Sequence, residues 1–301
     1  MLDPRSRFRL RAILLMPLVL GVMCKFTIAA KEAVKMAEIA PNLLVFETVA
    51  GNVVVSVGPD GALLIGTPSK SSTARISSVL SGRTNSALRY VIIFPQDADH
   101  SEGDAGWGRL GAFVAMQENA LRRLGGNEMG PPPPLSRHLG ELGVDRPRIA
   151  FSEVLAFDLN GESIHIVRQK PGFSNADAIA HFHVAKLVYL GEVFPGDGYP
   201  TIDPSQGGTL DGLMKTLDAW TDSTFTVVPA RGPVTNGARV KSFRDMIGAV
   251  RDRVQHMIDE GRSESQVLVD HPTADFDAQW GHGRAPPDAF VREIYAALKG
   301  Q

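Results

Sequence analysis

The chain has 301 residues, of which 44% are hydrophobic and 21% are charged, which is typical of a globular protein. Its 31 basic and 33 acidic residues give a net charge of −2, so no basic excess indicates nucleic acid as a partner. The single cysteine, Cys24, excludes an intramolecular disulfide framework and a cysteine-rich zinc module. Composition therefore indicates a slightly acidic globular chain, and its 30 glycines and 20 prolines indicate many tight turns.

The first 30 residues have the pattern of an export signal. Four arginines precede a twelve-residue apolar run at 12–23, and small residues follow at Ala29 and Ala30. The run is too short to span the roughly 30 Å apolar core of a bilayer comfortably as a helix. This order of basic, apolar and small residues is typical of a secretory signal peptide, so we predict a periplasmic or secreted mature protein. The alternative is an uncleaved N-terminal anchor, which would be the protein's one contact with a membrane.

Residues 31–301 are predicted to form a single domain of alternating strands and helices. Alternating or continuous apolar runs predict strands, and apolar spacings of three and four predict helices. The predicted strands are residues 42–56 and 62–65, which form a hairpin, and residues 90–94, 153–159, 163–167, 178–183, 187–190 and 225–229. The predicted helices are residues 71–80, 118–124, 210–220, 240–260 and 290–298. Two strand-rich halves that each end in helices predict two stacked sheets with helices outside.

Four short stretches stand out by their motifs and by their order along the chain. They are a hairpin at 51–65, a strand and polar loop at 90–104 containing Asp99-His100, a hairpin at 178–192 ending in Gly191-Glu192, and a Pro-Ala-Arg-Gly-Pro-Val turn at 229–234. Together, over about residues 43–268, they resemble the metallo-β-lactamase fold hydrolases. The stretches resemble, respectively, the family's first hairpin, its H-x-H-x-D-H loop, its T-G-D hairpin and its P-G-H-G-P-V turn.

This resemblance implies a four-layer αββα sandwich of two mixed β-sheets with outer helices. It also implies the family's dinuclear zinc site along the sheet edge, where lactam, thioester, phosphodiester or sulfate ester bonds are cleaved. Zinc sites of this kind need imidazole and carboxylate ligands and an open position for water.

Most of the family's ligand positions are replaced in this chain. Matched position by position, the family's histidines fall on Pro95, Asp97, Phe173 and Arg231, and an acid of its early strand falls on Gly66. The first metal site thus loses all three imidazoles, with only Asp97 as a possible ligand in exchange. We therefore expect the dinuclear centre to be dismantled.

The remaining positions bring acids and a permanent cation together. The resemblance retains an aspartate and a histidine as Asp99 and His100, and it places Glu192 where the family has its bridging carboxylate. A guanidinium is always protonated and only donates hydrogen bonds, so Arg231 cannot ligate a metal. Near Asp99 and Glu192 it would supply positive charge where the family has zinc, pairing bidentately with a carboxylate. We predict a vestigial cleft of Asp97, Asp99, His100, Glu192 and Arg231 that needs no cofactor.

Three interpretations of function follow, and whether the protein is an enzyme differs among them. In the first, an exported protein with a dismantled zinc site is non-catalytic or altered, and its cleft binds a small molecule or a protein partner. In the second, Asp97, Asp99, His100 and Glu192 hold one divalent cation (Zn, Mn or Mg) for a hydrolase, because oxygen ligands suit hard cations. In the third, the protein is structural or accessory and its cleft is filled; Asp99 and His100 then persist only as hydrogen-bonding loop residues.

A separate H-x-H pattern is formed by His181 and His183. Alternate residues of a strand lie on the same face, so both imidazoles are expected on one side of the sheet. Their predicted position near a hairpin tip favours a pair of surface side chains over a metal site.

Overall fold

The computed structural model describes residues 34–48, 50–66, 70–83, 87–94, 111–124 and 147–300. The signal peptide or anchor predicted for residues 1–30 lies outside these ranges, so it stays a prediction, as does the single domain predicted for 31–301. No helix in the described ranges is both long enough and apolar enough to cross a membrane.

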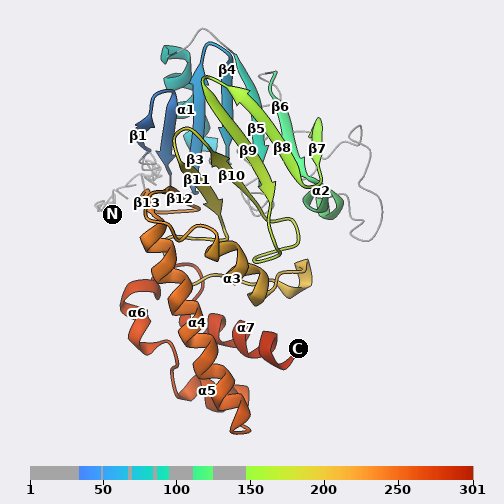
Figure 1. The fold of residues 1–301 in the computed structure, drawn as a ribbon, viewed down its shortest axis with the longest axis vertical. Coiled ribbons are helices and arrows are strands. Elements are labelled where there is room, and N and C mark those ends of the chain that lie inside the picture. The colour runs from blue at the N-terminus through green and yellow to red at the C-terminus, as the bar shows by residue number, and fades with distance from the viewer. Residues whose placement is uncertain are drawn as a thin grey trace, which may run out of the picture. The chain divides into compact units, whose positions relative to one another are not determined.

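Two mixed β-sheets form the centre of the fold (Figure 1). The first sheet follows chain order, with antiparallel pairing from β1 to β4 and parallel pairing from β4 to β7. Its strands are β1 (Lys35–Ala40), β2 (Leu43–Glu47), β3 (Asn52–Gly58), β4 (Gly61–Ile65), β5 (Leu88–Ile93), β6 (Phe113–Gln117) and β7 (Ile149–Phe151).

The second sheet has the order β13-β12-β11-β10-β9-β8 and is antiparallel except for the parallel pair β11 and β12. Its strands are β8 (Val154–Leu159), β9 (Glu162–Arg168), β10 (Ala178–Phe182), β11 (Leu187–Gly191), β12 (Thr226–Pro229) and β13 (Thr235–Asn236). The parallel pair matters for the site, because the carboxyl ends of β11 and β12 lie at the same edge.

Helices cover the outer face of each sheet. The first sheet is covered by α1 (Lys70–Arg83) and α2 (Glu118–Leu124). Helices from the last third of the chain, drawn in ochre to red in Figure 1, share one apolar core with the second sheet, and α7 packs on α4 and α5: α3 (Leu210–Asp218), α4 (Gly237–Asp259), α5 (Glu264–Val269), α6 (Ala274–Trp280) and α7 (Pro287–Lys299). A short 3₁₀ helix, Pro204–Gln206, precedes α3. The predicted four-layer αββα sandwich is therefore confirmed.

Alternation along the strands builds the layers. In β11, Leu187 and Tyr189 belong to the core between the sheets, whereas Val188 and Leu190 belong to the core under the helices. Successive side chains of a strand point to opposite faces, so a strand covered on both sides is apolar throughout. Continuous apolar runs such as the one at 187–190 are thus explained by burial on both faces.

Several elements differ from the sequence prediction. The predicted strand 42–56 is two antiparallel strands, β2 and β3, because the chain reverses at Gly51, whose φ is +151° and whose N–H donates to the Thr48 carbonyl at 3.2 Å. β1, β6, β7, β13, α5 and α6 were not predicted. β6 runs directly into α2 without a turn residue, and β7 has only three residues, so neither gives a clear sequence signal.

Candidate functional site

The Asp177 loop (residues 171–177) follows β9 and carries Phe173, where the family has a histidine. The Asp177 carboxylate accepts hydrogen bonds from the backbone N–H groups of Gly172 (2.9 Å), Phe173 (2.7 Å) and Ser174 (2.9 Å), and from the Ser174 hydroxyl (2.9 Å). Burial raises the pKa of Asp177 to about 6, although these donors act to lower it. Asp177 therefore organises the loop from within and sets the backbone that positions Phe173.

Helix α3 also holds the Asp177 loop. Thr209, which caps α3, donates from its hydroxyl to the Pro171 carbonyl at 2.8 Å and accepts from the Gly212 N–H at 3.0 Å. A Cβ on Gly212 would lie 1.8 Å from the Pro171 carbonyl oxygen, so only glycine permits this approach. The Thr209-x-x-Gly212 pattern thus fixes the distance between helix and loop.

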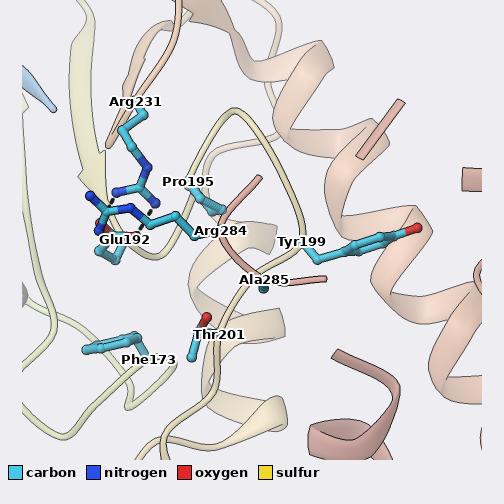
Figure 2. Close-up of a pocket in the computed structure, with 8 residues that line it drawn as sticks. All are labelled: Phe173, Glu192, Pro195, Tyr199, Thr201, Arg231, Arg284 and Ala285. Carbon is cyan, nitrogen blue, oxygen red and sulfur yellow. Dashed lines mark hydrogen bonds and ion pairs between the residues drawn. The ribbon is translucent and has the colours of Figure 1, made fainter. Parts of the chain in front are cut away.

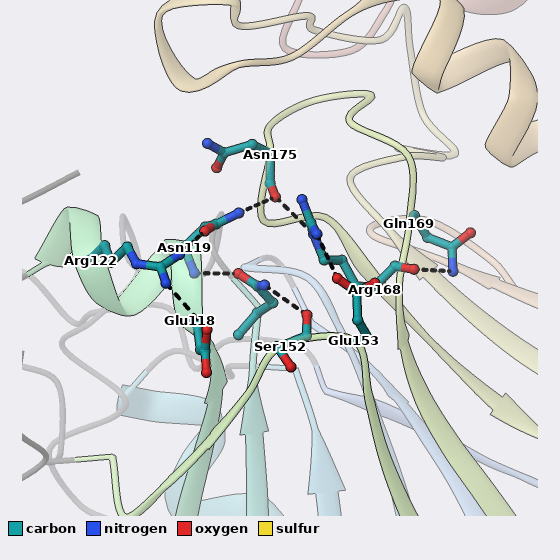
Figure 3. A network of polar contacts seen from close by, with 9 residues as sticks. Glu118, Asn119, Arg122, Ser152, Glu153, Arg168, Gln169 and Asn175 are labelled. Carbon is teal, nitrogen blue, oxygen red and sulfur yellow. Dashed lines mark hydrogen bonds and ion pairs between the residues drawn. The ribbon is translucent and has the colours of Figure 1, made fainter. Parts of the chain in front are cut away.

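Asn175 ties the other side of the Asp177 loop to α2 and β9 (Figure 3). Its carbonyl accepts from the Asn119 side chain at 2.8 Å and from Nε of Arg168 at 3.4 Å. Its side-chain oxygen accepts from Arg123 at 3.0 Å. Arg168 also forms an ion pair with Glu153 at 2.8 Å. The loop is therefore held by α2, by β9 of the second sheet and by α3.

A bidentate ion pair joins the ends of β11 and β12. Glu192 follows β11 and Arg231 follows β12, so the parallel pairing brings together two residues that are 39 positions apart. The two terminal nitrogens of Arg231 donate to the two carboxylate oxygens of Glu192, with Nη2 2.8 Å from Oε2. Burial lowers the pKa of the Arg231 guanidinium, but the hydrogen bonds and charge of Glu192 more than offset this and leave it raised. The cation is therefore permanently present in the site.

The loop around this pair is tightly built. Arg231 and Ala230 donate their N–H groups to the carbonyls of Pro195 and Phe194, each at 3.1 Å. A Cβ on Gly196, whose φ is +84°, would lie 2.3 Å from the Arg231 carbonyl oxygen. Asp197 adds an ion-pair contact, with Oδ2 3.3 Å from Nε of Arg231. The segment 191–197 thus wraps around the Arg231 guanidinium.

Asn52, at the start of β3, links the first sheet to this turn. Its side-chain nitrogen donates to the carbonyls of Pro229 (3.0 Å) and Gly232 (2.8 Å), and its backbone N–H donates to the Ala230 carbonyl at 2.7 Å. Asn52 is 2% exposed. Sequence reasoning missed this residue, and an asparagine that opens an otherwise apolar strand was the available signal.

The ion pair lines a cavity of about 100 Å³ (Figure 2). The described residues that line it are Phe173, Glu192, Pro195, Tyr199, Thr201, Arg231, Arg284 and Ala285. Figure 2 shows the guanidinium groups of Arg231 and Arg284 both directed toward Glu192. The Tyr199 hydroxyl points away from the cavity and donates to Asp277 at 2.7 Å, so it adds only its ring to the wall. Tyr199, Thr201 and Arg284 were not foreseen from the sequence.

The structure brings together only part of the predicted site. Glu192 and Arg231 pair as expected, and Phe173 lies on the same cavity wall. Pro95, Asp97, Asp99 and His100 lie outside the described residues, so the roles assigned to Asp97, Asp99 and His100 stay predictions. These include a one-metal site of Asp97, Asp99, His100 and Glu192.

Gly66, where the family has an acid, has no room for a side chain. Its φ is +93°, and a Cβ there would lie 2.8 Å from the Asn52 carbonyl oxygen and 3.3 Å from the Tyr189 hydroxyl. The glycine is therefore part of how β3, β4 and β11 approach one another, and the position offers no ligand.

The described part of this site does not fit zinc. Both oxygens of Glu192 accept from Arg231, which has no lone pair to offer, and the Phe173 ring has no ligand atom. Within the ranges that the structure describes, no three His, Cys, Asp or Glu side chains are grouped so as to hold a metal ion. On the described side of the cleft, Glu192 and Arg231 form an ion pair with each other rather than a set of metal ligands.

The H-x-H pattern forms part of a histidine cluster on the outer face of the second sheet. Nε2 of His183 lies 3.0 Å from Nδ1 of His165, and His183 is exposed. His181 instead packs edge-on against Trp220 and Phe225, and burial, with its two histidine neighbours, lowers its pKa to about 4. The two imidazoles lie side by side on one face of the sheet, with centroids 4.0 Å apart; His183 is exposed, and the aromatic residues after α3 leave His181 half-buried.

Comparisons with known proteins identify the fold. No protein-family model and no curated protein matches the sequence. The stereoselective inverting sec-alkylsulfatase Pisa1 from Pseudomonas sp. superposes with a TM-score of 0.58 at 14% identity, over 87% of this chain and 50% of that one. This chain therefore spans about half the length of that sulfatase.

Two metallo-β-lactamases match over nearly their whole length. DIM-1 gives a TM-score of 0.56 at 12% identity, over 71% of this chain and 97% of the lactamase. The metallo-β-lactamase from Pontibacter korlensis gives 0.53 at 14% identity, over 71% and 99%. The chain has the metallo-β-lactamase fold, as the sequence motifs predicted.

Proposed function

We propose that this protein is an exported metallo-β-lactamase-fold protein that binds a small molecule in its former active-site cleft without the zinc chemistry of the fold. The observation that carries this proposal is the bidentate pair between Arg231 and Glu192 on the cavity wall. Export rests on the N-terminal sequence alone.

Charge compensation supports the proposal. Glu192 is largely buried, with 18% of its side chain exposed, and a carboxylate in such a place needs a partner charge. In the fold's hydrolases that charge comes from metal ions, whereas here a guanidinium supplies it permanently. A metal bound by Glu192 would first have to displace this cation. The cleft thus keeps its shape and an acid at this position, but Arg231 already neutralises the charge of Glu192.

The cavity supports binding rather than a filled cleft. Its space of about 100 Å³ is bordered by charged, aromatic and hydroxyl side chains. A concave site with a few convergent polar groups is the usual form of a small-molecule site. A protein whose cleft served only to complete the core would pack apolar side chains into this space instead.

A hydrolase panel tests this function. Purified protein would be assayed against a lactam, a thioester, a phosphodiester and a sulfate ester, each with and without added Zn²⁺ or Mn²⁺. We expect no metal-dependent turnover above the rate without protein. Turnover that requires the metal and disappears in Asp99→Asn, but not in the matched loop variant Asp104→Asn, would refute the proposal and establish the single-metal hydrolase instead.

A further inference from the structure

Three imidazoles lie together on the outer face of the second sheet. His165 of β9 and His181 of β10 are cross-strand partners, and His183 directly follows β10. The backbone N–H of His183 donates to the Ser163 carbonyl at 3.0 Å, which continues the pairing of β10 with β9. The ring centroid of His183 lies 4.4 Å from that of His165 and 4.0 Å from that of His181. The register of the sheet thus places the three side chains beside one another.

The histidine cluster and Glu192 lie at opposite ends of the second sheet. β10 and β11 are antiparallel, with Phe182 opposite Leu187, so β10 ends where β11 begins. Glu192 instead follows the other end of β11, which has five residues. At about 3.3 Å per residue, the length of β11 separates the two groups. The chemistry of the cluster is therefore independent of the chemistry proposed for the cleft.

Two of the imidazole nitrogens have the separation of chelating ligands. Nδ1 of His165 and Nε2 of His183 lie 3.0 Å apart. An ion that binds each nitrogen at about 2.0–2.1 Å holds two of them about 2.9 Å apart at a right angle and about 3.3 Å apart at a tetrahedral angle. The ion would replace the hydrogen bond between the rings, with both imidazoles neutral and their protons on the other ring nitrogens. Because His183 is exposed, its ring has room to turn toward an ion.

The third histidine supports the pair from one side. His181 packs edge-on against Trp220 and Phe225, with ring centroids 5.0 and 5.7 Å away. Burial, with the two neighbouring histidines, lowers the pKa of His181 to about 4, so its ring is neutral at neutral pH and does not repel a cation. Water would complete the coordination of the ion, because the described residues group no third protein ligand with the pair.

We propose that His165 and His183 form a surface site for a divalent transition-metal ion of the kind that imidazole prefers, such as Ni²⁺, Cu²⁺ or Zn²⁺. Neighbouring strands hold the two ligands close together before an ion arrives, which lowers the cost of ordering them. A site with two protein ligands is weaker than the three- and four-ligand sites of zinc proteins. We therefore expect it to be empty after purification without added metal and to fill on titration. This inference goes beyond the proposed function and needs no metal in the cleft.

Nickel titration tests the proposed site. Untagged full-length wild type, His165→Ala and His183→Ala would be titrated with Ni²⁺ in a calorimeter. We expect each variant to bind at least about tenfold more weakly, because loss of a group that merely orients a metal ligand already costs about 10- to 100-fold. The matched control is His256→Gln, which removes an exposed histidine of α4 that lies 3.3 Å from Glu260 and is expected to leave the affinity unchanged. Since His183 is exposed, His183→Ala keeps the test available if His165→Ala does not fold.

Tryptophan fluorescence gives a second measurement that depends on location. The Trp220 ring is in contact with His181, which lies beside His183. A paramagnetic ion such as Cu²⁺ quenches the emission of a nearby indole. We expect Cu²⁺ to quench the Trp220 emission, measured as the difference between wild type and Trp220→Phe, and we expect His183→Ala to reduce this quenching.

Three results would each overturn the inference: no nickel binding by wild type, equal affinity in wild type and both cluster variants, or an equal loss in His256→Gln. Copper quenching of Trp220 that is unchanged in His183→Ala would also overturn it. Metal-dependent turnover in the hydrolase panel that persists in His183→Ala would instead refute the proposed function, so the two failures are distinguishable.

Discussion

Two carboxylates at the same edge of the second sheet, Asp177 before β10 and Glu192 after β11, are stabilised in different ways. Asp177 is 3% exposed and is held by four neutral donors within its own loop. Glu192 is held by the guanidinium of Arg231, 39 residues away. The hydrogen bonds of Asp177 are local and fix the conformation of its loop. The pair of Glu192 and Arg231 joins two distant segments and borders the cavity.

The difference shows two ways in which a buried or half-buried carboxylate is stabilised, by neutral donors or by a cation. Neutral donors leave Asp177 with a raised pKa, since burial outweighs them. Glu192 has a full opposite charge beside it in a partly buried place. Asp177 is thus stabilised by hydrogen bonds within its own loop, whereas Glu192 is stabilised by the cation of Arg231.

Arg231→Met is expected to have the largest effect on stability. It leaves the Glu192 carboxylate largely buried without its cation, which costs about 3 kcal/mol in the free energy of unfolding. Urea denaturation at pH 7 measures this, with Arg292→Met as the exposed control, expected to change stability by less than about 0.5 kcal/mol. A loss below about 1 kcal/mol for Arg231→Met would mean that the pair does not stabilise Glu192.

Asp177→Asn is expected to cost about 2 kcal/mol, because the new amide group faces N–H donors that lose their acceptor. Urea denaturation of the variant and of wild type measures this loss. A variant as stable as wild type would show that the loop holds its shape without Asp177.

The contribution of Asp177 to the free energy of unfolding depends on pH. The pKa of Asp177 is raised from 3.8 to about 6, so the folded state binds more protons than the unfolded state between those values. Its contribution is therefore fully present below about pH 4 and is lost as the pH rises through about 6. The stability advantage of wild type over Asp177→Asn should shrink from pH 4 to pH 7. An advantage that grows over this range would contradict the raised pKa.

Much of the fold could be predicted because its signals are local. The apolar runs at 187–190 and 225–229 identify β11 and β12, and a parallel pair of this kind places Glu192 beside Arg231. The order of four motifs then implied the sandwich. The strand β6 escaped prediction because it runs directly into α2, and β7 because it has only three residues.

The rest of the cavity depends on contacts between distant segments. Arg284 reaches the wall from the loop between α6 and α7, and α6 itself was not predicted. Asn52 contributes through hydrogen bonds to residues about 180 positions away. Hydrophobic periodicity carries no information on such contacts, so a single sequence could suggest Glu192 and Arg231 but not the groups around them.

The central claim is that a side-chain cation stands where relatives of this fold place metal. It is tested most directly by elemental analysis of the full-length protein purified without added metal, followed by zinc titration of wild type and Arg231→His. We predict far less than one equivalent of zinc in wild type, and zinc uptake that changes more than expression does in Arg231→His. One full equivalent or more of tightly bound zinc in wild type would contradict the account.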